Sequence, residues 1–136
     1  MNYTQLLNLA KEARAASYSP YSGFAVGAAL LCRDGRVFLG CNVENASFSP
    51  TCCAERVAIF KAISEGVRDL EAIAVVGGRG DETTPRCLPC GVCRQVLAEF
   101  CDGDFPVILE AEDRAPVSLT LDRLLPHRFT LRTEEL

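Results

Sequence analysis

Two short runs, far apart in the chain, constrain its fold more than any other feature. Cys53-Ala54-Glu55 opens one apolar helical pattern, and Pro89-Cys90-Gly91-Val92-Cys93 opens another. Cys90 and Cys93 stand close to one helical turn apart, so both side chains can reach a single ion. Because each run begins a helix, unpaired N–H groups and the positive dipole end favour the thiolate form of its cysteines. The fold therefore has to join two helix starts around one metal ion.

Three cysteine ligands leave the fourth position of a tetrahedral zinc ion open for water. Glu55 closely follows Cys53 without being a ligand itself, and a carboxylate there can move the protons of that water. This combination favours an enzyme over a zinc-stabilised scaffold. Three thiolates also leave an excess negative charge on a divalent ion, so a cation is expected nearby. Arg56 and Arg94 adjoin the two runs and are expected to hydrogen-bond the ligand sulfurs.

Two other metal sites compete with this interpretation. In the first, Cys52 or Cys87 serves as a fourth ligand and closes a structural zinc site. In the second, the run from Cys87 to Cys93 has the cysteine spacing of a bacterial ferredoxin, but Cys101 comes too late to complete an iron–sulfur cluster. A Cys-x-x-Cys pair alone is weak evidence. Joined to Cys-Ala-Glu, it favours the open zinc site.

Length and composition are those of a globular protein. The 136 residues, 49% of them apolar, suit one domain spanning 1–136 with a single core. A net charge of −4 without a block of Lys or Arg argues against a nucleic-acid partner. Residues 1–14 resemble neither a secretory signal nor a transit peptide, and no run approaches about 18 apolar residues. We therefore expect a cytoplasmic protein that binds no membrane.

The eight cysteines are expected to be reduced, because a chain with a full-sized core and no export signal has little need of disulfides. Cys32, Cys41 and Cys101 lie in apolar runs and are expected in the core, where free cysteine behaves as a small hydrophobic residue. Cys52 and Cys87 are harder to assign, since both stand beside the proposed ligands.

Apolar periodicity and turn residues predict an alternation of helices and strands. Helices are expected at 4–17 and 53–65 and again after 89, the last with an apolar stripe of Val92, Val96, Leu97 and Phe100. Strands are expected at 24–32, 36–40, 70–76, 106–109 and 116–119, with a hairpin turn at Asp34-Gly35 and a loop at 77–89. This order predicts one mixed sheet with helices on its faces, a fold of the α/β class.

The zinc-dependent nucleobase deaminases have a sequence signature, which is a metal ligand, one further residue and Glu, followed downstream by Pro-Cys-x-x-Cys. By this signature, the chain resembles cytidine deaminase in its small three-cysteine form. The match runs from near Tyr18 to Phe129 and includes residues 21–30, 40–47, 53–56, 89–95 and 124–126. The resemblance implies a three-layer α-β-α sandwich around a mixed five-stranded sheet.

The resemblance also implies the chemistry. Zinc would lie on Cys53, Cys90 and Cys93, and an activated water would attack C4 of the cytosine ring. Glu55 would take a proton from that water, deliver it to N3 and later protonate the departing amine. The implied reaction is hydrolysis of cytidine and deoxycytidine to uridine, deoxyuridine and ammonia, as in pyrimidine salvage, with Zn²⁺ as the cofactor.

Several residues are implied in substrate binding. Asn42 and Glu44 resemble the pair that hydrogen-bonds the ribose hydroxyls, and Phe24 resembles the aromatic residue that packs on the base. Ala54 would offer its backbone N–H to the base carbonyl. From the residues alone, Phe24 is equally well a core residue at the start of a strand, and 42–45 is an ordinary polar loop.

The family is usually homotetrameric, with sites completed across subunit borders. By that likeness, Ala46, Phe48 and Phe129 would come from neighbouring chains. Two positions depart from the family pattern, since Phe48 stands where tyrosine is common and Leu88 replaces the usual serine or threonine. A deaminase of another small base or nucleoside, of the blasticidin type, is the alternative. The residues do not separate cytidine from deoxycytidine.

Overall fold

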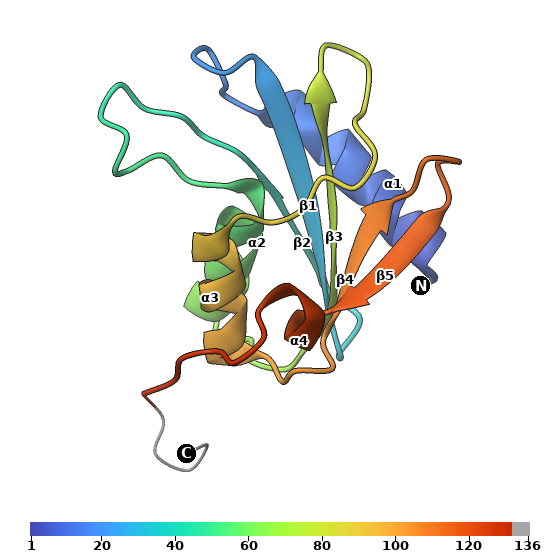
Figure 1. Ribbon diagram of the computed structural model, residues 1–136, viewed down its shortest axis with the longest axis vertical. Coiled ribbons are helices and arrows are strands. Elements are labelled where there is room, and N and C mark those ends of the chain that lie inside the picture. Colours follow the sequence, from blue (N-terminus) through green and yellow to red (C-terminus); the bar gives the residue numbers. More distant parts are fainter. Residues whose placement is uncertain (132–136) are drawn as a thin grey trace.

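The computed structural model describes residues 1–131 of the 136-residue chain. Its centre is a five-stranded mixed sheet with the order β2-β1-β3-β4-β5, in which only β3 and β4 are parallel neighbours (Figure 1). The strands are β1 (Phe24–Cys32), β2 (Val37–Cys41), β3 (Leu70–Arg79), β4 (Pro106–Glu110) and β5 (Pro116–Thr120). The helices are α1 (Tyr3–Ala13), α2 (Ala54–Ser64), α3 (Gly91–Phe100) and α4 (Leu121–Leu124), with a 3-10 turn, Arg14–Ala16, after α1. Within residues 1–131, no helix is long and apolar enough to cross a membrane.

Helices cover both faces of the sheet and make three layers (Figure 1). α1 lies on one face, where Leu6 and Ala10 join a buried cluster with side chains of β1, β3 and β4. α2, α3 and α4 lie on the other face over a second buried cluster that includes Ile59, Leu97 and Leu121. The mixed five-stranded sheet and the α-β-α layers confirm the fold predicted from the sequence.

The hairpin of β1 and β2 follows from its local sequence. β1 is an almost unbroken apolar run because helices cover the sheet on both sides, and its C-terminal half is fully buried. At the turn, Asp34 Oδ1 accepts a hydrogen bond from the backbone N–H of Arg36 at 3.0 Å, and Gly35 adopts a φ of 93°, which glycine tolerates. The resulting register pairs Ala28 with Gly40.

β3 ends at Arg79, beyond the position that the sequence predicts. Gly77 and Gly78 pair with β1 instead of beginning the loop. Close packing explains these glycines, because a Cβ on Gly78 would lie 2.0 Å from the carbonyl oxygen of Glu82. On Gly77 it would lie 2.6 Å from Cys87 Sγ. The two glycines therefore belong to the sheet and let the following segment fold back against it.

The predicted apolar stripe of α3 is wrong in one position. Val92 is 57% exposed, whereas Cys93, Leu97 and Ala98 are buried. The helix is turned so that Cys93 faces the interior, and its neighbour Val92 then points outward. Cys41 also departs from expectation, since it is only half-buried.

Candidate active site

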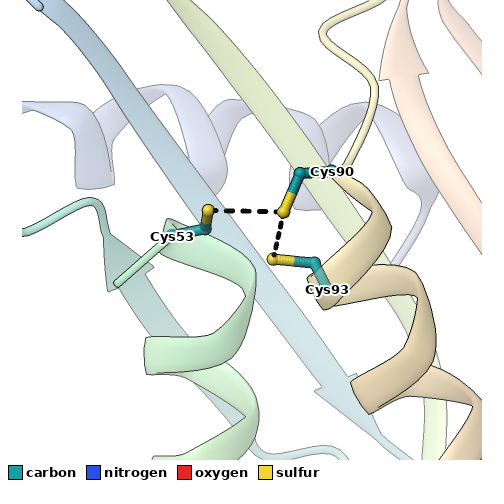
Figure 2. Close-up of side chains that lie close together, drawn as sticks. All are labelled: Cys53, Cys90 and Cys93. Atoms are coloured by element: carbon teal, nitrogen blue, oxygen red, sulfur yellow. Dashed lines mark hydrogen bonds between the residues drawn. The ribbon is translucent and has the colours of Figure 1, made fainter. Parts of the chain in front are cut away.

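The three predicted ligands converge at the starts of α2 and α3. Cys53 is the N-cap of α2 and Cys90 is the N-cap of α3, both with extended backbones, and Cys93 lies in the first turn of α3. Figure 2 shows the three sulfurs pointing toward one another. Cys53 Sγ lies 3.6 Å from Cys90 Sγ, which lies 3.5 Å from Cys93 Sγ. Two helix starts therefore present their free N–H groups beside one cluster of sulfurs.

These distances fit a single zinc ion. Zn–S bonds of about 2.3 Å in tetrahedral geometry place neighbouring sulfurs about 3.8 Å apart. All three sulfurs lie within 4.8 Å of one another, and the metal-binding group found among residues 1–131 consists of Cys53, Cys90 and Cys93. Cys52 and Cys87 stay outside this group. The geometry therefore favours the three-cysteine site over a closed four-cysteine one.

The thiols around the site differ in how readily they ionise. A hydrogen bond from Cys93, together with the Arg56 guanidinium, lowers the pKa of Cys53 to about 5. Burial raises the pKa of Cys52, and burial raises the pKa of Cys87 to about 11. The hydrogen bond between Cys53 and Cys93 raises the pKa of Cys93 in turn, so the three-cysteine ligand set rests on the distances between the sulfurs and not on these shifts.

Arg56 supplies the cation expected beside the thiolates. Its Nη2 donates to Cys53 Sγ at 3.4 Å and lies 3.5 Å from the carbonyl oxygen of Thr51. Its Nε is buried and has no hydrogen-bond partner within residues 1–131. A half-buried guanidinium with a free Nε donor beside a cysteine cluster suits a site that carries excess negative charge.

Arg94 differs from the expectation that it contacts a ligand sulfur. Its Nε donates to the carbonyl oxygen of Pro89 at 2.8 Å, and its Nη1 donates to that of Leu124 at 2.7 Å. The first bond holds the backbone just before Cys90, and the second ties α3 to the end of α4. Arg94 therefore acts on the ligand through the backbone rather than through sulfur.

Glu55 lies in the first turn of α2 and is only 3% exposed. Burial, reinforced by the negative charge of Cys53, raises the pKa of Glu55 to about 7. A carboxyl group with this pKa can accept and donate a proton near neutrality. The structure thus places beside the sulfurs an acid suited to proton transfer.

A cavity of about 260 Å³ opens beside these groups. It brings together the residues expected to bind the base and the ribose with two metal ligands and the acid, namely Phe24, Asn42, Glu44, Ala54, Cys53, Cys90 and Glu55. The remaining wall consists of Val26, Thr51, Cys52, Cys87 and Leu88. A polar edge with Asn42 and Glu44 and an apolar wall with Phe24 suit a ligand that has both a sugar and a flat ring.

Ala46, Phe48 and Phe129 lie outside this cavity in the single chain. Phe48 is 81% exposed and lines a neighbouring cavity that shares Glu44 and Thr51 with the first. Phe129 is 65% exposed. Their contribution to the site of another chain stays a prediction.

Hydrogen bonds that sequence reasoning missed hold Asn42 in place. Its Nδ2 donates to the carbonyl oxygen of Phe24 at 2.8 Å, and its Oδ1 accepts from the backbone N–H of Val26 at 2.9 Å. The hydroxyl of Ser17 also donates to Oδ1. Asn42 therefore joins the loop after β2 to the start of β1. No local signal marks Ser17 for this task.

Glu44 is held by the loop before β1. Its Oε1 accepts from the backbone N–H groups of Tyr21 and Ser22 at 3.0 and 3.1 Å, and its Oε2 accepts from the Ser22 hydroxyl. The hydroxyl and backbone hydrogen bonds from this loop lower the pKa of Glu44. Tyr21 and Ser22 lie in the segment 21–30 that carries the family resemblance, which is the signal that could have identified them.

A cavity lined by a buried acid and by two members of a three-cysteine group that could hold zinc is characteristic of zinc-dependent hydrolytic enzymes. Residues 1–109 match the family described as "Cytidine and deoxycytidylate deaminase zinc-binding region". A cytidine deaminase of Sporosarcina psychrophila is 48% identical over 130 residues, which cover 96% of this chain and 93% of that protein. The chain belongs to the cytidine and deoxycytidylate deaminase family.

Comparison of structures agrees with this assignment. The crystal structure of a cytidine deaminase from Burkholderia pseudomallei has a TM-score of 0.85 and 44% sequence identity, covering 95% of this chain and 100% of that chain. A blasticidin-S deaminase of Bacillus cereus is less similar, with 29% identity over 109 residues that cover 77% of this chain and 76% of that protein. The comparisons therefore favour the cytidine deaminase branch over the blasticidin type.

Proposed function

We propose that this chain hydrolyses cytidine and deoxycytidine to uridine and deoxyuridine with release of ammonia. The observation that carries the proposal is the burial of Glu55 in the same cavity as Cys53 and Cys90. A structural zinc site does not require a buried acid beside it, whereas a hydrolytic site requires a group that transfers protons. Relatives named cytidine deaminase match nearly the whole chain and support this substrate class.

Cys53, Cys90 and Cys93 would hold zinc, which would supply the Lewis acidity needed to activate a water near neutral pH. Glu55 accepts the proton that the water loses and delivers it to N3 of the base as C4 is attacked. It then takes the second proton from the hydroxyl now on C4 and passes it to the departing amine, so that the C4–N bond breaks as the C4 carbonyl forms, with one water consumed and one ammonia released. Arg56 offsets the charge of the thiolates through its bond to Cys53.

Asn42 and Glu44 are the proposed ribose ligands. Glu44 Oε1 uses both of its lone pairs in the bonds from Tyr21 and Ser22, whereas Oε2 keeps one after its bond from the Ser22 hydroxyl, and Asn42 Nδ2 has a second N–H beyond the one given to Phe24. Both side chains are already fixed, so binding a sugar costs them little conformational entropy. Phe24 would pack on the base, and the N–H of Ala54 would donate to its carbonyl.

The proposed active form is a homotetramer in which Ala46, Phe48 and Phe129 complete a neighbour's site. Phe48 and Phe129 are 81% and 65% exposed, and contact with another subunit would remove these large apolar side chains from water. Light scattering on the purified protein measures the mass directly, and a monomer would contradict this part.

The proposed compartment is the cytoplasm, where the reaction would serve pyrimidine salvage. All eight cysteines are free, which suits a reducing compartment. Recovery of the protein from a membrane or secreted fraction of its own cells would contradict this placement.

The decisive experiment replaces Glu55 by glutamine in the zinc-loaded protein. Zinc should stay near one ion per chain, because no ligand is removed, while loss of the cytidine absorbance band should slow by about 10²–10⁴-fold. Glu65→Gln, on an exposed residue at the other end of α2, is the matched control and should retain full turnover. Turnover retained by Glu55→Gln would exclude Glu55 as the proton carrier.

A parallel assay defines the substrate. Wild-type protein is offered cytidine, deoxycytidine, cytosine and adenosine under the same conditions. The proposal predicts turnover of the two cytosine nucleosides, because Asn42 and Glu44 would hold the sugar. Turnover of none of the four, with zinc bound, would favour a deaminase of another small nucleoside or a non-catalytic zinc protein.

A further inference from the structure

Glu110, the last residue of β4, is a buried carboxylate that the proposed reaction does not use. Its side chain is 1% exposed, and charged groups are seldom buried unless they are paired. Lys11 Nζ lies 3.0 Å from its Oε2, and Arg114 Nη1 lies 3.1 Å from its Oε1. The hydroxyl of Thr83 donates to Oε1 at 2.6 Å. Burial opposes ionisation, but the hydrogen bond from Thr83 and the ion pair with Lys11 outweigh it and lower the pKa of Glu110.

These partners fasten the connection between β3 and α3 to the end of β4. Arg114 Nη1 also donates to the carbonyl oxygen of Thr83 at 2.8 Å, so both the side chain and the backbone of Thr83 are held. Three residues later, the backbone N–H of Arg86 donates to the carbonyl oxygen of Glu110 at 2.7 Å. In Figure 1, the connection turns back at the tip of β3 and passes the end of β4 on its way to α3.

The fastened segment leads directly into the zinc site. Arg86 has a φ of 55°, a left-handed conformation that a non-glycine residue keeps only where its surroundings impose it. The next residues, Cys87 and Leu88, line the cavity, and Cys90 is a metal ligand. The direction of the chain at Arg86 therefore decides where Cys90 begins α3.

We propose that Glu110 is a positioning residue that keeps Cys90 and the cavity wall at Cys87 and Leu88 in place through the connection from Thr83 to Arg86. Glu110 does not line the cavity itself. Without the charge of Glu110, the connection from Thr83 to Arg86 becomes more mobile. Cys90 is then no longer held in position for zinc. The predicted effect of Glu110 on zinc binding is independent of the substrate, whereas its predicted effect on KM rests on the proposed function.

Two substitutions in the zinc-loaded full-length protein test this role. Glu110→Gln keeps the shape of the side chain and removes the charge that pairs with Lys11 and Arg114, and Thr83→Val removes one hydroxyl. We expect zinc transfer to a chromogenic chelator to be about tenfold faster in both, since losing support around a zinc ligand costs on the order of 10–100-fold. The KM for cytidine should rise more than kcat falls, because the cavity wall moves while Glu55 stays.

The matched control is Asp69→Asn, which breaks an exposed ion pair with Arg33 of 3.1 Å at the opposite end of β3. Its zinc transfer should equal that of the wild type. If Glu110 only stabilised the fold, the variants would have a lower Tm. Their zinc transfer would nevertheless equal that of the wild type at a temperature at which all of them are folded, and that result would overturn the proposal. Should Glu110→Gln not fold, Thr83→Val alone decides by the same criterion. Faster zinc transfer in a protein that never deaminates cytidine would support the proposal and refute only the proposed function.

Discussion

Gly40 of β2 determines how closely α2 approaches the sheet, and therefore where α2 places its catalytic end. A Cβ at this position would lie 2.3 Å from the carbonyl oxygen of Ala54 and 2.6 Å from the backbone nitrogen of Ala58. Carbon–oxygen contacts as close as about 3.3 Å are the ordinary limit, so Gly40→Ala requires α2 to move away by about 1 Å. Both obstructing atoms are backbone and cannot turn aside as a side chain could.

The displacement reaches the site because α2 begins there. Cys53 is the N-cap of α2 and Glu55 is in its first turn, whereas Cys90 and Cys93 lie on α3. Moving α2 by about 1 Å therefore separates one predicted ligand and the acid from the other two predicted ligands. A misplacement of this size costs about 10²-fold in rate, and overpacking typically lowers the free energy of unfolding by about 1–3 kcal/mol.

The measurements are zinc content, cytidine turnover per folded chain and the urea midpoint. Ser118→Ala, a change of similar size at an exposed position of β5, should match the wild type in all three. Folded Gly40→Ala with wild-type turnover would refute the argument, because it would mean that α2 shifts without moving Cys53 and Glu55, or does not shift.

Other expected outcomes test the ligands, the subunit contact and the acid response. Cys90→Ser should release zinc under mild chelation, while Cys52→Ala and Cys87→Ala should keep zinc and most turnover; metal loss from either alanine variant would show that the ligand set is wrong. Phe129→Ala should lower turnover by more than tenfold if that residue completes a neighbour's site, and wild-type rates would count against the tetramer. Because the folded-state pKa of Glu110 is lowered, its stabilisation is present above the unfolded pKa of about 4.3 and is lost as pH falls through the folded value. The stability gap between wild type and Glu110→Gln, from urea midpoints, should therefore shrink between pH 7 and pH 3; a constant gap would show that the charge of Glu110 does not stabilise the fold.

Features with a local sequence signal were predicted correctly. The turn at Asp34 and Gly35 determines the register of the hairpin, because side chains of a strand alternate in direction and a turn of given length allows one pairing. The predicted ligands Cys90 and Cys93 are neighbours at one helix start, so the proximity of their sulfurs is also a local property, while their binding of zinc stays a prediction. Cys53 was identified because it stands directly before an apolar helical run.

Several features that depend on contacts between distant segments were not predicted. Gly77 and Gly78 have the composition of a loop, yet pairing with β1 makes them part of the sheet. The bond from Ser17 to Asn42 spans 25 residues and leaves no periodic trace in the sequence. The same holds for the partners of Arg94, which are backbone carbonyls that any residue could supply.

The spacing of Cys87, Cys90 and Cys93 does not by itself show which of these cysteines can share a metal, because that depends on the local backbone conformation. The two intervals are equal in sequence, and both are compatible with a shared metal if the chain is helical throughout. Only the second interval is helical, because α3 begins at Gly91 with Cys90 as its N-cap. Cys87 follows a residue with positive φ in a segment bonded to β4, so its sulfur lies against Gly77 in the cavity wall and not in the cysteine cluster. The third predicted ligand, Cys53, comes from the start of a different helix, α2, whose first turn also carries Glu55, so this non-local arrangement brings the acid to the cysteine cluster.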